Sequence, residues 1–310
     1  MQGFPGFFVP VIPQITMTNA TAFNPLKDAE QMNSLIAGIT GESVERVAER
    51  LEYERKHPGR TVAGDFAKYD GPRYEWGKHL EEFYSRTNAF LYELVVWNRN
   101  NLKRQLRRWT TRHMARQGRS LDVLSIGDGL GFDCLHFAAR QHRMTYFELP
   151  GLSEQFARRL FKLSNREIPV LTDPAAIPKE SYDAITCFDV LEHVPNPPEL
   201  VRTFVSYLKP GGLFYVSAPF YMILPWYPTH LRSNRRYAGS VKLYEQAGLK
   251  LVNGQFTWYP LVFQKPPISE AACGGTTLVR MTGMVQSVGR IAAWPFLPVH
   301  LARRISNREN

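Results

Sequence analysis

The chain changes its pattern of apolar and polar positions near residue 120. Before it, apolar side chains recur every three or four residues, first after Ser43 and again after Gly71-Pro72, which predicts amphipathic helices. The second stretch is too long for one ordinary helix, so we expect two or three helices, the last capped by Gly118. The first 40 residues carry scattered prolines and are expected to be irregular. Residues 1–118 are thus predicted to form a helical N-terminal cap on the rest of the chain.

From Leu121 onward, short apolar runs alternate with helical stretches. Five runs, with helices such as 132–140 and 153–163 between them, predict parallel strands joined by right-handed crossovers. Two further runs near residues 249–264 have only a short link, which is typical of an antiparallel hairpin. Residues 119–267 are therefore expected to form an α/β, Rossmann-like, doubly wound sheet of seven strands, mostly parallel with one antiparallel edge strand.

Cysteine usage and hydropathy bear on the compartment. The three cysteines are far apart, which excludes a disulfide framework and a zinc-binding spacing. No run of about 18 uncharged apolar residues is present, and the apolar N-terminus has no basic leader region. We therefore expect a cytoplasmic protein with neither a membrane-spanning helix nor a signal peptide.

The net charge of +10 is unevenly distributed. Residues 98–121 hold eight basic side chains and no acidic one, and residues 268–310 form a basic, amphipathic extension. Such segments favour nucleic acid, a phospholipid surface or an acidic substrate, although a solvated helix face explains them equally well. The extension could lie on a membrane surface or pack on the core. The basic side chains of the first segment are Arg99, Lys103, Arg104, Arg107, Arg108, Arg112, Arg116 and Arg119.

A glycine-rich turn follows the first apolar run. Gly127, Gly129 and Gly131 suit a sharp strand-to-helix turn whose backbone approaches a ligand closely. Glu148 ends the second run, where a carboxylate can accept hydrogen bonds from both hydroxyls of a ribose. Asp173, after the third run, is placed to meet an adenine amino group. The sequence thus predicts a nucleotide-like cofactor site.

The motifs IGDGLG, FELPG, LTDPAAIP, YDAITCFDVLEHV, LKPGGLFYVSAP and YEQAGLKLV occur in this order. Their order resembles that of class I S-adenosylmethionine (SAM)-dependent methyltransferases, including ubiquinone-pathway O-methyltransferases and natural-product or sugar methyltransferases. The resemblance covers about residues 120–265. It departs at Ser125, where the family usually has an acid that holds the methionine amino end; Asp128 or a water on Ser125 could substitute. The implied SAM-binding residues are Ser125, Gly127, Asp128, Gly129, Gly131, Glu148, Asp173, Phe188 and Asp189.

The resemblance also points to residues for chemistry. Asp189, Glu192 and His193 share one face if their segment is helical, and they are similar to a metal-binding acid-x-x-Glu-His motif of ubiquinone-pathway and small-RNA 2′-O-methyltransferases. His230 is the candidate second histidine. A divalent cation such as Mg²⁺ would lower the pKa of an acceptor hydroxyl. Alternatively, Glu192 and His193 brace the loop without metal, and His193 or His230 acts as general base.

Three functions remain open at this point. We expect O-methylation of a small or medium-sized metabolite, ring-bearing or anionic, because the cap is rich in aromatic residues and His230 is followed by arginines. A nucleic-acid methyltransferase would use the Arg99–Arg119 segment and bind with steep salt dependence. A non-catalytic binding module is suggested only by Ser125, and loss of SAM binding would favour it.

Overall fold

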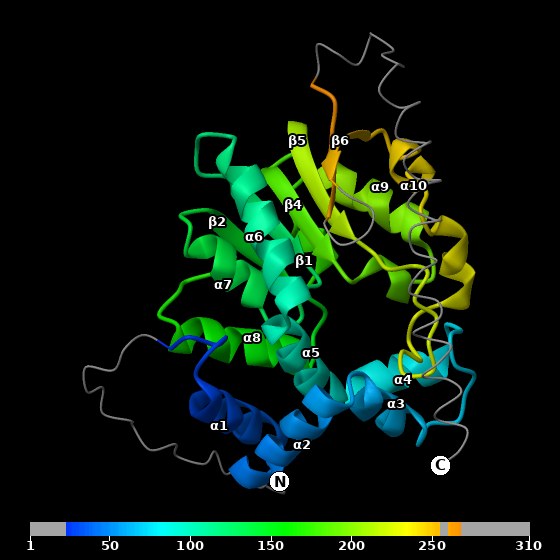
Figure 1. Cartoon of the computed structure of the whole chain (residues 1–310). Helices are drawn as coiled ribbons and strands as arrows, with labels where there is room; N and C mark the ends of the chain where they lie inside the picture. Colours follow the sequence, from blue (N-terminus) through cyan, green and yellow to red (C-terminus); the bar gives the residue numbers. More distant parts are fainter. Residues whose placement is uncertain (1–22, 255–259, 268–310) are drawn as a thin grey trace, which may run out of the picture.

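The computed structural model describes residues 23–254 and 260–267, so the predicted extension 268–310 lies outside the described residues. Within them, helices precede the sheet (Figure 1). The expectation of irregular structure up to residue 40 is wrong for residues 29–40, because this segment forms a helix that buries Met32, Leu35 and Ile36. The helices are α1 Ala29–Thr40, α2 Val44–Lys56, α3 Arg60–Phe66, α4 Lys78–Arg86, α5 Ala89–Arg99 and α6 Asn101–Ala115.

The long helical stretch before the sheet consists of α4, α5 and α6, so the prediction of two or three helices is confirmed. The predicted cap position is wrong, since α6 ends at Ala115 with Arg116 as its C-cap. Gly118 lies two residues further on, in a turn where its φ of 66° is left-handed. Glycine adopts this conformation without the steric cost that a side chain would bring.

The seven-stranded sheet has the order β3-β2-β1-β4-β5-β7-β6. The pairs from β3 to β5 are parallel, whereas β7 is antiparallel to both β5 and β6, which confirms the predicted hairpin. The antiparallel strand lies one place in from the edge strand β6. The strands are β1 Asp122–Ile126, β2 Arg143–Phe147, β3 Val170–Leu171, β4 Tyr182–Phe188, β5 Leu208–Ser217, β6 Lys250–Gly254 and β7 Leu261–Gln264.

Helices cover both faces of the sheet. One core cluster joins the sheet to α1, α5, α6, α7 and α8, and a second joins it to α9 and α10. The central strand β4 is buried along its whole length, as expected for a parallel strand packed on both faces. The chain reverses its winding direction beside β1, and such switch points are where doubly wound sheets bind ligands. The helices after α6 are α7 Phe132–Ala138, α8 Leu152–Leu163, α9 Pro197–Tyr207 and α10 Lys242–Glu245.

The N-terminal helices are held to the sheet by specific contacts. In Figure 1, α6 runs across one face of the sheet. There, His113 Nδ1 lies 2.9 Å from the Tyr215 hydroxyl on β5. Further along the chain, Arg159 on α8 donates to the Gly38 carbonyl on α1 at 2.7 Å. Of the helices that the described ranges contain, none is long and apolar enough to cross a membrane.

Candidate active site

The turn after β1 is built from glycines in the left-handed conformation. The φ angles of Gly127, Gly129 and Gly131 are 66°, 63° and 78°. A Cβ atom on Gly127 would lie 2.5 Å from Val190 Cγ2, and one on Gly131 would lie 2.6 Å from Phe161. Both the backbone conformation and the packing therefore require glycine, and the turn brings bare backbone to the carboxyl end of β1.

Glu148 follows β2 and reaches this turn. Its Oε2 accepts a hydrogen bond from the Gly129 N–H at 3.0 Å, and its Oε1 accepts one from the Leu149 N–H at 3.0 Å. Burial raises the pKa of Glu148 to about 7. The carboxyl group is therefore placed against the glycine turn and can exchange its backbone partners for ligand hydroxyls.

Ser125 and Asp128 have structural partners of their own. The buried Ser125 hydroxyl accepts a hydrogen bond from Thr186 on β4 at 3.0 Å. The two oxygens of Asp128 accept from the N–H groups of Asp133 and Cys134, at 3.0 and 2.7 Å. Asp128 thus satisfies the first turn of α7, and burial together with the neighbouring Asp133 raises its pKa above its usual range.

The remaining predicted cofactor residues lie at or just after the ends of β3 and β4. Asp173 is exposed and accepts from the Ala175 N–H at 2.9 Å, which caps a short 3₁₀ turn. Phe188 is buried at the end of β4. Next to it, Asp189 has a left-handed φ of 60°. A strained residue of this kind at the end of a strand is typical of a functional site.

Asp189 meets two side chains that the sequence analysis did not assign to the site. Its Oδ2 accepts from Trp97 Nε1 on α5 at 3.0 Å and from Lys103 Nζ on α6 at 3.3 Å. Lys103 also lies 3.3 Å from Asp133, which pairs with the buried Arg107. Helix α6 of the cap therefore supplies the basic side chains that pair with Asp189 and Asp133.

Glu192, His193 and His230 form a second group. Each offers one ligand atom, and these atoms all lie within 4.8 Å of one another. The rings of His193 and His230 are 4.6 Å apart and nearly perpendicular. Glu192 is 1% exposed, and within the described part of the chain its two carboxyl oxygens and His230 Nδ1 have no hydrogen-bond partner. Buried polar atoms without partners are rare and point to a ligand or a water.

Asp189 does not belong to this group. The predicted helical face is wrong, because Leu191–His193 form a 3₁₀ turn and the left-handed Asp189 precedes it. The described structure brings together three of the four predicted metal ligands.

Aromatic side chains enclose the histidine pair. The Tyr84 hydroxyl on α4 lies 3.1 Å from His193 Nδ1, and its ring stacks on Phe90 with centroids 5.2 Å apart. Tyr227 stacks on His230 at 4.9 Å. Burial lowers the pKa of His193 to about 4 and that of His230 well below its usual range. Both imidazoles are therefore neutral at neutral pH, the form that ligates metals.

The basic segment Arg99–Arg119 is divided by the fold. Lys103 and Arg107 are buried and paired with acids, and Arg119 pairs with Asp183 at 3.0 Å. The segment is therefore not one continuous exposed face. Four arginines spaced by four residues are exposed along α6 and at its C-cap: Arg104, Arg108, Arg112 and Arg116.

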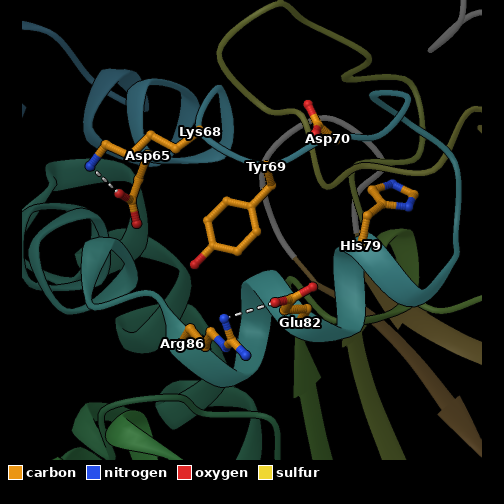
Figure 2. A pocket seen from close by; sticks show the side chains of 7 residues that line it. All are labelled: Asp65, Lys68, Tyr69, Asp70, His79, Glu82 and Arg86. Carbon is orange, nitrogen blue, oxygen red and sulfur yellow. Dashed lines mark hydrogen bonds and ion pairs between the residues drawn. The ribbon is translucent and has the colours of Figure 1, made fainter.

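A separate hollow of about 460 Å³ lies between α3 and α4. Figure 2 shows Tyr69 projecting between two ion pairs, Lys68 with Asp65 at 2.7 Å and Arg86 with Glu82 at 2.9 Å. The charges that line it largely satisfy one another, so it offers less chemistry than the histidine group. Its lining residues are Asp65, Lys68, Tyr69, Asp70, His79, Glu82 and Arg86.

Comparison with known proteins agrees with this geometry. A family model described as "Methyltransferase domain" matches residues 98–257. The chain is similar to a ubiquinone biosynthesis O-methyltransferase of Xanthomonas axonopodis pv. citri, with 49% identity over 100 residues that cover 31% of this chain and 41% of that protein. A protein of the same name from Stutzerimonas stutzeri is 27% identical over 157 residues, or 49% of this chain and 61% of that protein. The matches thus span about half the length of these relatives.

Among solved structures, the chain is similar to an O-methyltransferase family protein from Burkholderia thailandensis. The TM-score is 0.47 at 16% identity, and the match covers 75% of this chain and 72% of the other.

Proposed function

This chain belongs to the methyltransferase domain family, and from that premise we propose that it transfers the methyl group of SAM to an oxygen of a small or medium-sized metabolite. The observation that carries the proposal is the contact between Glu148 and the glycine turn after β1. A carboxylate there can accept hydrogen bonds from both ribose hydroxyls of the cofactor, while the bare backbone of the turn lies close to the rest of it.

The remaining residues of the site would divide into those that contact the cofactor and those that contact the methyl acceptor. Asp173 follows β3 and would meet the adenine, whereas Phe188 is the last residue of β4 and Asp189 follows it. The sulfonium of SAM is already electrophilic, so the protein mainly has to hold the acceptor oxygen in line with the methyl group and to accept its proton. His193 and His230 lie on the acceptor side in this arrangement, because the cap residue Tyr84 contacts His193.

The second group fits a divalent cation. Among the described residues, neither carboxyl oxygen of Glu192 nor His230 Nδ1 has a hydrogen-bond partner, His193 Nε2 lies 3.9 Å from Glu192 Oε1, and His193 is neutral. These three residues would hold the cation, and one carboxylate with two imidazoles suits Zn²⁺, Fe²⁺ or Mn²⁺ better than Mg²⁺. A bound cation would supply Lewis acidity that lowers the pKa of the acceptor hydroxyl. Cobalt(II) titration monitored by visible absorption tests this fit, and we expect His230→Ala to abolish the spectrum.

The methyl-transfer proposal is tested with SAM labelled in its methyl group. The purified chain is incubated with a panel of hydroxylated ring compounds, with and without a chelator, and labelled products are identified by mass. Transfer to oxygen that is lost in Glu148→Ala supports the proposal. Transfer only to nitrogen or carbon would contradict the assignment of the acceptor atom.

A nucleic-acid acceptor is the second candidate, and the exposed arginine row of α6 favours it. Arg104, Arg108, Arg112 and Arg116 would contact phosphates, so affinity for duplex RNA should fall steeply with salt. Replacing all four with glutamine should flatten the salt dependence. Binding that does not respond to these substitutions would remove this candidate.

A further inference from the structure

The histidine group is assembled from two segments that are far apart in the sequence. The 3₁₀ turn Leu191–His193 after β4 carries Glu192 and His193, and the segment 228–234 after β5 carries His230. In the described part of the chain no hydrogen bond orients the Glu192 carboxyl group. The three ligand atoms can therefore meet only if the backbones of the two segments are held in a fixed relation.

Asn234 joins the two segments. It is fully buried in the 3₁₀ helix Arg232–Tyr237, and its Nδ2 donates to the carbonyls of Leu191, Glu192 and Val194 at 3.2, 3.3 and 2.8 Å. Buried backbone carbonyls need hydrogen-bond partners, and a short helical turn cannot supply them from within. The turn that carries two of the ligand residues is therefore held by the segment that carries the third.

Backbone contacts hold the same segment on both sides of its histidine. The Leu231 N–H donates to the Glu192 carbonyl at 2.9 Å. Tyr74 of the cap donates its N–H to the Pro228 carbonyl at 2.9 Å, and its own carbonyl accepts from the Arg232 N–H at 2.8 Å. Tyr74 has a left-handed φ of 70°, a strained conformation that persists only where the surrounding contacts enforce it. The segment is thus fixed to the turn and to the cap.

The segment also orients the ring of His193. His193 Nδ1 lies 3.3 Å from the carbonyl of the buried Thr229. A carbonyl can only accept, so this contact places the hydrogen on Nδ1 and leaves the lone pair of Nε2 for a ligand. Nε2 is the nitrogen that lies 3.9 Å from Glu192 Oε1. Segment 228–234 therefore supplies one histidine and orients the other.

We propose that Asn234 is a positioning residue that holds the turn after β4, so that its Glu192 and His193 meet the second histidine in a preassembled cation site. The hydrogen bonds of Asn234 go to backbone carbonyls, so it acts through the backbone that carries the ligand side chains. Residues that orient metal ligands typically contribute about 10- to 100-fold in metal affinity. This inference rests on the proposed function, because it takes the histidine group to be the cation site.

The test is a titration of the full chain with cobalt(II), followed by visible absorption, beside the variant Asn234→Ala. The variant should bind cobalt(II) about 10- to 100-fold more weakly and give a different visible spectrum at saturation. Its affinity for S-adenosylhomocysteine (SAH), measured by calorimetry, should be unchanged, since the hydrogen bonds of Asn234 all go to the turn after β4. Asn234→Ser, whose hydroxyl can still donate to one carbonyl, should have an intermediate cobalt(II) affinity.

Asn88→Ala is the matched control. Asn88 donates to Glu42 Oε1 at 3.0 Å and accepts from Arg50 at 3.1 Å, so the same substitution removes side-chain hydrogen bonds within the cap. It should lower the thermal unfolding temperature without weakening cobalt(II) binding. The unfolding temperatures of the variants at 234 also show that they are folded.

The possible failures are distinguishable. Absent SAH binding by the folded, unaltered chain would contradict the proposed function itself. Binding of SAH without binding of cobalt(II) would overturn the inference about Asn234 and leave methyl transfer in place. An unchanged cobalt(II) affinity and spectrum in Asn234→Ala, or in Asn234→Ser if the alanine variant does not fold, would also overturn it. So would an equal loss of cobalt(II) and SAH affinity, because Asn234 would then stabilise the fold as a whole.

Discussion

Replacing Gly127 with alanine would test whether the turn after β1 needs a glycine for its conformation, its packing or both. The residue has a φ of 66°, which costs an alanine about 1–2 kcal/mol. The new methyl group would also lie 2.5 Å from Val190 Cγ2, well inside van der Waals contact. Val190 is β-branched and therefore stiff at χ1, so relief requires a shift of its backbone that costs about 1–3 kcal/mol more.

Gly118 is the matched control for this substitution. It has the same φ of 66°, but a Cβ there would meet nothing within 4 Å. Gly118→Ala should therefore lose only the conformational part, and Gly127→Ala should unfold at a temperature lower by a further ~2–4 °C for each kcal/mol of steric cost. Thermal unfolding followed by circular dichroism measures both. In the Val190→Ala background, the excess cost of Gly127→Ala should largely disappear.

Equal losses of stability for the alanine variants at 118 and 127 would refute this reasoning. So would an excess at 127 that persists in the Val190→Ala background. Either result would mean that the turn is looser than the packing of Val190 implies, and that a close approach of backbone to cofactor is not enforced there.

Two other predictions concern buried charges. Glu148 has a pKa of about 7, and it must lose its proton before both carboxyl oxygens can accept hydrogen bonds from a ribose. SAH affinity should therefore fall by up to about tenfold per pH unit below pH 7. Glu148→Gln should remove this pH dependence in calorimetric titrations, and a pH dependence that persists in the variant would mean that another group causes it. Asp133→Asn leaves the buried Lys103 and Arg107 without their shared partner, so it should lower the free energy of unfolding in urea by about 3–5 kcal/mol. Glu49→Gln breaks an exposed ion pair with Arg46 and should lower it by less than about 1 kcal/mol. Equal losses of stability would contradict the buried network.

The sequence pattern predicted the sheet well for a physical reason. Parallel strands covered on both faces are continuous apolar runs, and β4 shows this most clearly because it is buried along its whole length. The glycine turn was equally readable, since three positive φ angles in five residues leave few alternatives to glycine. Signals of this kind are local, so they do not depend on the rest of the fold.

Other features depend on contacts between distant residues. The charge pattern along α6 suggests that Lys103 and Arg107 are solvated, but both side chains are buried because they form ion pairs with Asp133 on α7. The sequence analysis did not predict helix α1, because its apolar residues follow a proline-rich stretch. A residue far away in the sequence contacts this helix, since Arg159 of α8 donates a hydrogen bond to the Gly38 carbonyl. The sequence alone contains neither contact.

The aromatic residues of the cap show the same limit at the site. Tyr84 and Phe90 have the spacing of ordinary core positions, and only the placement of α4 beside the 3₁₀ turn Leu191–His193 brings Tyr84 to His193. The helical face assumed for Asp189, Glu192 and His193 failed because the chain turns at Asp189.

The central claim, that the turn after β1 and Glu148 form the cofactor site, is tested most directly by calorimetric titration of the purified chain with SAH, beside Glu148→Ala. We expect micromolar binding to the unaltered chain and a loss of at least about tenfold in the variant, as for a charged hydrogen-bond acceptor removed from a ligand. Absence of binding to the well-folded chain, or equal affinity in the variant, would contradict the claim.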